Sequence, residues 1–141
     1  MTKEELNKVR DLTRRICAEE IRLHNLTDWL KRITRELDGL PTEPNFQRSK
    51  IEELTTQKVD CENKLNELKA ERATEQSKLL SKIDELLSDN EQKLMMAERY
   101  GFGNNFKDIA ELLNKSEDHI YFIHRKAIKK ITGKKSKITV R

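Results

Sequence analysis

The stretch FKDIAELLNKSEDHIYFIHRKAIKKI, residues 106–131, decides the fold expected for the carboxyl-terminal part of the chain. Apolar residues recur at helical spacing on both sides of the turn sequence Asn114-Lys115-Ser116. Asn105 stands directly before the first apolar segment and Ser116 directly before the second, where a short polar side chain can cap a helix. The pattern therefore predicts two helices, over 106–113 and 117–131, joined by a tight turn.

The spacing inside this stretch is typical of a helix-turn-helix. The two helices of that motif cross closely, and Ala110 supplies a small residue where they would touch. Four residues later the turn needs a residue that accepts a positive φ, and Asn114 tolerates that backbone. Ile120 and Ile123 follow at the offsets that bury the last helix against the first. We therefore expect a helix-turn-helix whose second helix is the recognition helix.

Two further helices are expected upstream of this motif. Residues 79–87 form a short amphipathic pattern, and Ser88 followed by Glu91 gives a capping box that opens a helix running to about Tyr100. The run Gly-Phe-Gly-Asn at 101–104 is expected to end that helix with residues that tolerate left-handed backbone. The expected domain therefore has four helices.

This part of the chain resembles a known family. Residues 79–131 are similar to region 4 of bacterial sigma factors, through Glu98-Arg99-Tyr100, Asp108-Ile109-Ala110, Ser116 and the run 120–127. More narrowly, Arg99-Tyr100, Ile109-Ala110, Ser116 and the run 119–128 resemble small phage-encoded proteins grouped near the RinA and ArpU transcriptional regulators of Gram-positive bacteria. That family also has a coiled amino-terminal part. The resemblance implies control of phage or prophage gene expression.

The candidate DNA-binding residues lie on the expected recognition helix and the basic segment after it. They are Ser116, Glu117, Asp118, Tyr121, Phe122, Arg125, Lys126, Lys129, Lys130, Lys134 and Lys135. Arg125 is the first candidate for a base or phosphate contact, and Tyr121 for a phosphate or a thymine methyl group. The lysines suit phosphate contacts, which supply affinity without sequence reading.

Three of these candidates carry an alternative interpretation. Glu117 and Asp118 would accept hydrogen bonds from cytosine in the major groove, or would only complement the positive end of the helix dipole. Phe122 would contact DNA or would pack internally. His119 and His124 are expected to be polar surface groups.

The charge distribution supports a polyanionic partner. The net charge is +4, and no acidic residue follows Asp118. The basic residues after that point are Arg125, Lys126, Lys129, Lys130, Lys134, Lys135, Lys137 and Arg141. Positive charge gathered at one end of a chain is typical of proteins that bind nucleic acid.

The amino-terminal part shows the periodicity of packed helices. A first seam with steps of three and four residues runs through Val9, Leu12, Ile16, Glu19, Leu23, Leu26, Leu30, Ile33 and Leu37. Gly39, Pro41 and Pro44 interrupt it. A second seam runs through Ile51, Leu54, Lys58, Cys61, Leu65 and Leu68, and then fails at Arg72 and Glu75.

These seams predict an antiparallel helical hairpin or coiled coil. In the expected register Arg72 falls opposite Ile16, which leaves Val9, Leu12 and Ile16 without an apolar partner in the same chain. We therefore expect a homodimer through the amino-terminal helices, unless the aliphatic parts of Arg72 and Glu75 cover this end. The expected organisation is a hairpin over 1–75, a DNA-binding domain over 76–132 and a basic tail over 133–141.

Composition excludes several other classes. Charged residues make up 38% of the chain and aromatic residues 5%, which is typical of long solvated helices. No metal site is indicated, because Cys17 and Cys61 lack ligand spacing. No cofactor or catalytic activity is indicated either, because the sequence shows no catalytic triad, phosphate-binding loop or acid/base pair. No apolar run approaches a membrane span, so we expect a soluble intracellular protein, and the resemblance implies the cytoplasm of a bacterial host.

The expected fold class is all-α, and the expected function is transcription regulation by sequence-specific binding to double-stranded DNA, without enzymatic activity. RNA polymerase is a candidate second partner. Two alternatives stay open: a small terminase-type DNA-packaging protein, and a sigma-like adaptor that binds protein rather than DNA.

Overall fold

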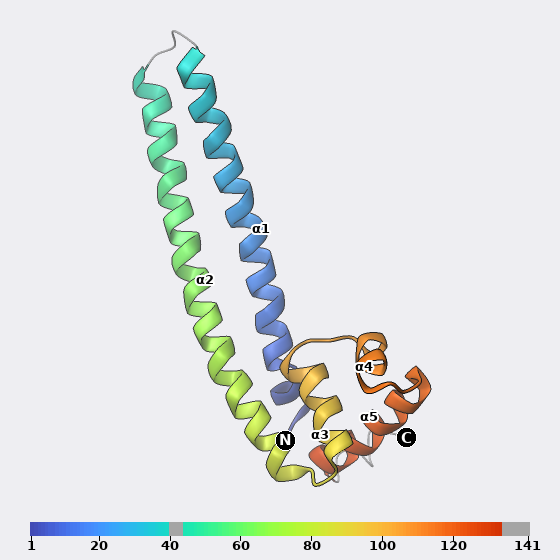
Figure 1. Cartoon of the computed structure of the whole chain (residues 1–141). Coiled ribbons are helices and arrows are strands. Elements are labelled where there is room, and N and C mark those ends of the chain that lie inside the picture. Colours follow the sequence, from blue (N-terminus) through green and yellow to red (C-terminus); the bar gives the residue numbers. More distant parts are fainter. Residues whose placement is uncertain (40–43, 134–141) are drawn as a thin grey trace. The chain divides into compact units, whose positions relative to one another are not determined.

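The computed structural model describes residues 1–39 and 44–133, and this part of the chain is all-helical with no strand (Figure 1). The elements in chain order are α1 (Lys3–Gly39), α2 (Pro44–Leu86), α3 (Asn90–Met96), the π-helical turn η1 (Ala97–Gly101), α4 (Phe106–Leu113) and α5 (Glu117–Thr132). The prediction of an all-α protein is confirmed.

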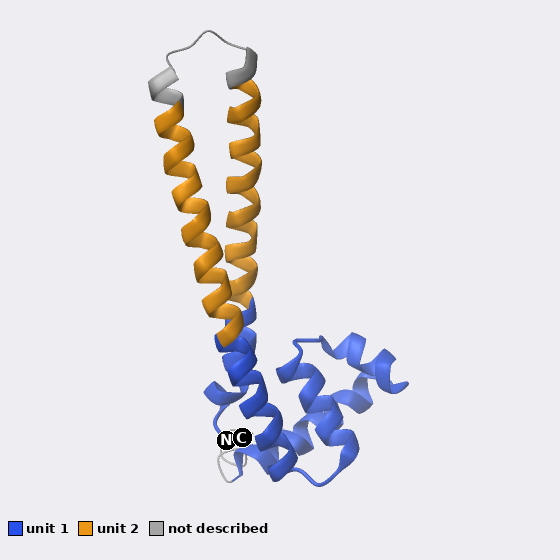
Figure 2. Cartoon of the chain, turned by 60° about the vertical axis from the view of Figure 1, so that its left-hand side comes forward, with its two compact units in different colours: residues 1–13, 71–141 blue, residues 14–70 orange. Residues whose placement is uncertain are grey.

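The chain divides into two compact units (Figure 2). Unit 1 contains residues 1–13 and 71–141, and unit 2 contains residues 14–70. Sequence reasoning had assigned residues 1–13 to the amino-terminal hairpin, whereas in the structure they belong to the same unit as α3, α4 and α5. Helices α1 and α2 each contribute residues to both units.

Unit 2 is built from α1 after residue 13 and from α2 up to residue 70, and these two stretches run antiparallel side by side (Figure 2). Its apolar core is Leu26, Leu54 and Cys61, with Leu23, Leu30 and Ile33 packed against it. The Cys61 thiol also lies 3.3 Å from the Glu19 carbonyl oxygen, which it reaches as a donor. All these core residues belong to the two predicted seams, so the seams correctly identified the buried face.

Unit 1 has a larger core to which five helices contribute. The buried residues of this core are Leu6, Val9, Leu79, Ile83, Leu87, Met95, Met96, Tyr100, Ile109, Ala110, Ile120, Ile123, Ala127 and Ile131. The first turns of α1, the end of α2 and the three short helices therefore share one apolar interior.

The prediction that the beginning of the first seam lacks an apolar partner in the same chain is wrong. Val9, Leu12 and Ile16 are only 2–3% exposed within the single chain. Val9, together with Leu6, is part of the unit 1 core, which contains residues of α3, α4 and α5. The prediction considered only α2 as a packing partner of α1. It did not consider the later helices α3, α4 and α5, which share the core with α1. The reason for expecting a homodimer is thereby removed.

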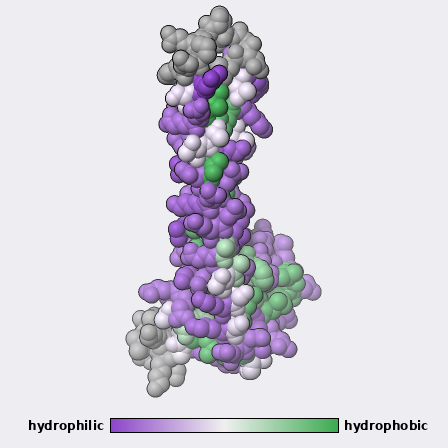
Figure 3. All heavy atoms as spheres, turned by 90° about the vertical axis from the view of Figure 1, so that its left-hand side faces the viewer, coloured by the Kyte–Doolittle hydropathy of each residue, from purple (hydrophilic) through white to green (hydrophobic). Residues whose placement is uncertain are grey.

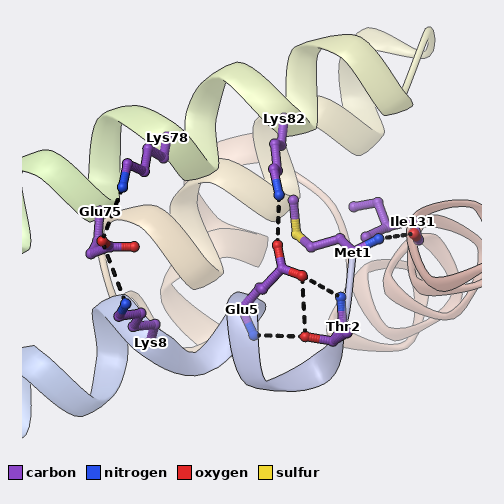
Figure 4. A network of polar contacts seen from close by, with 8 residues as sticks. All are labelled: Met1, Thr2, Glu5, Lys8, Glu75, Lys78, Lys82 and Ile131. Atoms are coloured by element: carbon purple, nitrogen blue, oxygen red, sulfur yellow. Dashed lines mark hydrogen bonds and ion pairs between the residues drawn. The ribbon is translucent and has the colours of Figure 1, made fainter.

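The seam break at Arg72 and Glu75 is used for polar contacts rather than for apolar ones. Arg72 is half-buried and donates to the Thr13 hydroxyl at 3.5 Å. The Glu75 carboxylate is mostly buried and lies 3.5 Å from the Lys8 ammonium and 3.6 Å from that of Lys78 (Figure 4). Polar contacts at Arg72 and Glu75 therefore take the place of the apolar residues missing from the second seam, while Val9, Leu12 and Ile16 of α1 stay buried.

The start of α1 is held by a capping box that sequence reasoning missed. The Glu5 amide donates to the Thr2 hydroxyl at 3.1 Å, and the Thr2 amide donates to the Glu5 carboxylate at 3.4 Å. The same carboxylate accepts from Lys82 at 2.7 Å, and the Met1 ammonium donates to the Ile131 carbonyl at 3.1 Å (Figure 4). The pattern of Thr2 and Glu5 three residues apart was the available signal.

The boundaries between α2 and α4 differ from the prediction in two respects. Residues 79–86 are the end of α2 rather than a separate helix. The cap of α3 is Asp89 and not Ser88, because the Asp89 carboxylate accepts the amides of Glu91 and Gln92. Of the run 101–104, Gly103 adopts the left-handed backbone, with a φ of 77°.

Hydrophilic residues cover most of the face shown in Figure 3. No helix among the described residues combines the length and the apolar character needed to cross a bilayer.

We predict that Leu6→Ala lowers the free energy of unfolding by about 2–5 kcal/mol, because Leu6 is 1% exposed and its loss leaves a cavity in the unit 1 core. Leu112→Ala removes the same atoms from a side chain that is 61% exposed, and should change it by about 0.5 kcal/mol or less. Urea unfolding followed by circular dichroism measures both. Equal effects of the two substitutions would contradict the burial of α1 in this core.

Candidate nucleic-acid interface

The segment from α4 to α5 has the local geometry that its sequence predicts. The Asn105 side chain caps α4 by accepting the Asp108 amide at 2.8 Å, and Ser116 caps α5 by accepting the His119 amide at 3.2 Å. Asn114 adopts the left-handed conformation, with φ 55° and ψ 48°. The Lys115 amide then donates back to the Ala110 carbonyl at 2.9 Å, which closes the turn. The two caps and the conformation of Asn114 are confirmed.

One face of α5 is buried against the rest of unit 1. Ile120, Ile123, Ala127 and Ile131 are at most 5% exposed and belong to the unit 1 core. Ala110 on α4 is 5% exposed in the same core, in agreement with the need for a small residue there. The positions of Ile120, Ile123 and Ala110 are therefore as expected from their spacing.

The opposite face of α5 is free of the core. At 100° per residue, Asp118, Phe122, Arg125 and Lys129 lie farthest from the buried face, and all four are exposed. The other candidates Ser116, Glu117, Tyr121, Lys126 and Lys130 are also exposed. Lys134 and Lys135, like Lys137 and Arg141, lie outside the described residues. The structure thus brings nine of the eleven candidates onto one helix and its cap.

The aromatic candidates are partly covered by neighbours. Phe122 is 45% exposed, and the Lys126 ammonium lies 4.5 Å from its ring centroid. The alternative in which Phe122 packs internally is therefore wrong. Tyr121 is 43% exposed, and its ring lies 4.5 Å from that of Phe106, the first residue of α4. Contact with Phe106 restricts Tyr121 and lowers the entropy that it would lose on binding a ligand.

His124 is half-buried and packs against aromatic neighbours, which corrects the expectation of a polar surface group. Its Nε2 lies 2.7 Å from the Tyr100 hydroxyl, and its ring meets the Phe106 ring edge-on at a centroid distance of 5.1 Å. Burial, followed by the charges of Arg99 and Arg125, lowers the pKa of His124 from 6.5 to about 4. The imidazole is therefore neutral at physiological pH. His119 is half-buried and lies 3.5 Å from the Glu91 carboxylate.

Arg99 belongs to this surface, and sequence reasoning did not select it. Its guanidinium carbon lies 4.4 Å from the Phe106 ring centroid, and its Nη1 donates to the Asn104 carbonyl at 3.4 Å. The π-helical turn η1 carries Arg99, and such insertions are frequent at functional sites. No periodicity in the sequence predicts a π-helical turn, so the position of Arg99 needed the tertiary structure.

The cysteines and acidic residues form no second site in the described part of the chain. No three side chains of the His, Cys, Asp or Glu type gather there in an arrangement that would hold a metal ion. Cys17 is exposed and Cys61 is buried, and both are free thiols. Burial, with the neighbouring Glu19, raises the pKa of the Cys61 thiol, which makes it a packing residue rather than a nucleophile.

Comparison with known proteins identifies no relative of this chain: no protein-family model, no curated protein and no solved structure matches it.

We predict that Asn114→Ala destabilises the protein by about 1–2 kcal/mol, because an alanine at a φ of 55° meets the steric cost of the left-handed region. Asn114→Gly should be nearly neutral, because glycine has no such cost. Thermal unfolding of the two variants measures the difference. Equal stability of the alanine and glycine variants would show that the turn does not require left-handed backbone.

We predict that stability falls as the pH is lowered from 6.5 towards 4. The folded-state pKa of His124 is below its ordinary value, so protonation in this window favours the unfolded chain. The loss should be about 1–2 kcal/mol, reduced from the full linkage value because part of the ring meets solvent. Urea unfolding at several pH values should show less loss in His124→Phe than in the unsubstituted protein. His119→Gln should retain the loss, and a retained loss in His124→Phe would exclude His124 as its source.

Proposed function

We propose that this protein is a sequence-specific DNA-binding regulator of transcription that reads the major groove with α5. The observation that carries the proposal is the division of α5 into two faces. Ile120, Ile123 and Ala127 fix one face in the core, while Phe122 and Arg125 on the other face are exposed. An α-helix presented in this way fits the width of the major groove.

In this proposal α4 and α5 are the two helices of a helix-turn-helix, in a domain resembling sigma region 4. The left-handed Asn114 sets the direction change between them, and Ser116 begins the recognition helix. The amino-terminal residues of a recognition helix contact base edges, which places Asp118, Tyr121 and Phe122 nearest the bases. Support comes from the capped turn and from the motif resemblance.

The side chains on the exposed face divide by chemistry. Arg125 can donate two parallel hydrogen bonds to guanine, and Asp118 can accept one from cytosine. Tyr121 offers a hydroxyl to a phosphate or a ring edge to a thymine methyl group. Lys126, Lys129 and Lys130 supply charge for phosphates along the groove edge and carry no sequence information. Glu117 serves the dipole of the helix in whose first turn it lies.

The same proposal assigns a role to unit 2 and to the protein in the cell. Unit 2 is a helical hairpin that docks a partner, with RNA polymerase as the candidate that the sigma resemblance implies. The resemblance also supports a phage or prophage regulator acting in the bacterial cytoplasm. With Val9, Leu12 and Ile16 buried in the chain, a homodimer would have to use other surfaces.

A second candidate function is an adaptor that binds protein through α5. The observation that favours it is the exposure of two aromatic rings, Tyr121 and Phe122, on that helix. Exposed aromatic residues are enriched in protein interfaces as well as in DNA interfaces. Binding to duplex DNA at low salt separates the two functions, because an adaptor of this kind would not bind the duplex.

We predict that Arg125→Ala weakens binding to a preferred duplex by about 1–3 kcal/mol and narrows the difference from a scrambled duplex, because a bidentate guanine contact is lost. The preferred duplex is first selected from a random pool, and affinities are then measured by fluorescence anisotropy. The matched control is Arg32→Ala, an exposed arginine of unit 2 whose loss should change neither affinity.

Equal losses on the two duplexes would make Arg125 a phosphate contact rather than a base reader. An unchanged affinity for both would exclude α5 as the reading helix.

A further inference from the structure

Two arginines of unit 1 lie on elements other than the helix-turn-helix, and one of them, Arg99, stacks on Phe106 beside α5. Arg99 belongs to η1, and Arg10 belongs to α1 directly after the buried Val9. Val9 and Tyr100, the chain neighbours of Arg10 and Arg99, share the unit 1 core. Both arginines thus border the same core, each is half-buried, and Arg10 is near enough for its charge to act on Arg99.

Arg99 is connected to α5 through stacked rings. The Phe106 ring lies 4.4 Å from the guanidinium carbon of Arg99 and 4.5 Å from the Tyr121 ring centroid. A guanidinium held over an aromatic face keeps a fixed plane, which leaves its outward N–H groups directed and ordered. Arg99 thus occupies a defined position next to the candidate reading face of α5.

No carboxylate neutralises this pair of arginines within the described residues. The ion pairs of unit 1 involve other basic residues, and neither Arg10 nor Arg99 forms one. The acid next to Arg99 in sequence is Glu98, and its carboxylate accepts from the side-chain amide of Asn104 at 2.8 Å. The acid next to Arg10 in sequence is Asp11, which forms no ion pair with Arg10. The Nε of Arg99 is buried and makes no hydrogen bond.

The charged form of Arg99 is disfavoured by its surroundings. Burial first, and then the charge of Arg10, lower the pKa of Arg99. Two like charges that approach each other without an acid favour the arrival of an anion, which would remove the repulsion.

We propose that Arg10 and Arg99 bind a backbone phosphate of the DNA, next to the bases that α5 reads. The inference rests on the proposed function and extends the interface onto α1, outside the helix-turn-helix. The first helix of such a motif crosses the DNA backbone, and Phe106, which holds Arg99, is the first residue of that helix. A planar guanidinium matches a phosphate through two parallel hydrogen bonds. Arg10 adds a second positive charge to the same site.

The experiment compares four full-length variants on a preferred and a scrambled duplex at several salt concentrations. Arg10→Gln and Arg99→Gln remove the proposed contacts, and Arg10→Lys keeps the charge. The matched control is Arg15→Gln, which removes the same charge from an exposed position of α1. Affinity is followed by fluorescence anisotropy, and thermal unfolding of each variant verifies that it is folded.

The expected result is that Arg10→Gln weakens binding severalfold and equally on the two duplexes. Its plot of log affinity against log salt should flatten by up to about 0.9, the contribution of one lost phosphate contact. Arg99→Gln should behave alike, whereas Arg10→Lys and Arg15→Gln should keep the original slope. If Arg99→Gln unfolds, Arg10→Gln decides the matter, because the side chain of Arg10 is not part of the apolar core.

Unchanged affinity and slope in Arg10→Gln would overturn the inference, and so would an effect no larger than that of Arg15→Gln. In either case a retained preference for one duplex would leave the proposed function intact. If the unsubstituted protein shows no preference but Arg10→Gln still flattens the slope, the phosphate site stands and sequence-specific reading fails. Absence of binding to any duplex at low salt would overturn both.

Discussion

The shared apolar core of unit 1 is the constraint on which the other features depend. Leu6 and Val9 from the first turns of α1 are buried with Ile120, Ile123 and Ile131 of α5, although more than a hundred residues separate them along the chain. Burial of such side chains contributes about 1.5–3 kcal/mol each, so α4 and α5 are not a self-sufficient pair of helices. The core of α3, α4 and α5 is completed by the first turns of α1, and this explains why residues 1–13 belong to unit 1.

This core determines which residues of α5 are available to a ligand. With Ile120, Ile123, Ala127 and Ile131 facing inward, the positions on the opposite side of the helix face outward. These positions carry Asp118, Phe122, Arg125 and Lys129. The neutral, half-buried His124 contacts Tyr100 and Phe106 and lies to one side of the outward face of α5. An uncharged ring at this place avoids adding a third positive charge to Arg99 and Arg125.

Polar contacts act together with the apolar core at the beginning of α1. The capping box of Thr2 and Glu5 satisfies amides that the first turn of a helix leaves unpaired, and the ion pair with Lys82 joins this turn to α2. Arg10, two turns after Thr2, is then carried by a helix whose position is set by its own cap and core. A basic side chain on such a rigid element loses little conformational entropy on binding an anion, which favours the proposed phosphate contact of Arg10.

Much of the candidate site was predictable from local sequence, and its wider context was not. The caps at Asn105 and Ser116 and the left-handed Asn114 depend on interactions between residues a few positions apart, so the sequence alone determined them. The apolar periodicity of α5 also showed which of its faces needs burial. The beginning of α1 was misjudged because Leu6 and Val9 share a core with residues of α2 to α5. A helical pattern shows which side chains need burial but not what buries them. The position of Arg99 beside Phe106 depended on a π-helical turn, and the burial of His124 depended on how α5 meets Tyr100. Only the tertiary structure decided these features, because they arise where separate elements meet in one core and local periodicity carries no information about such meetings.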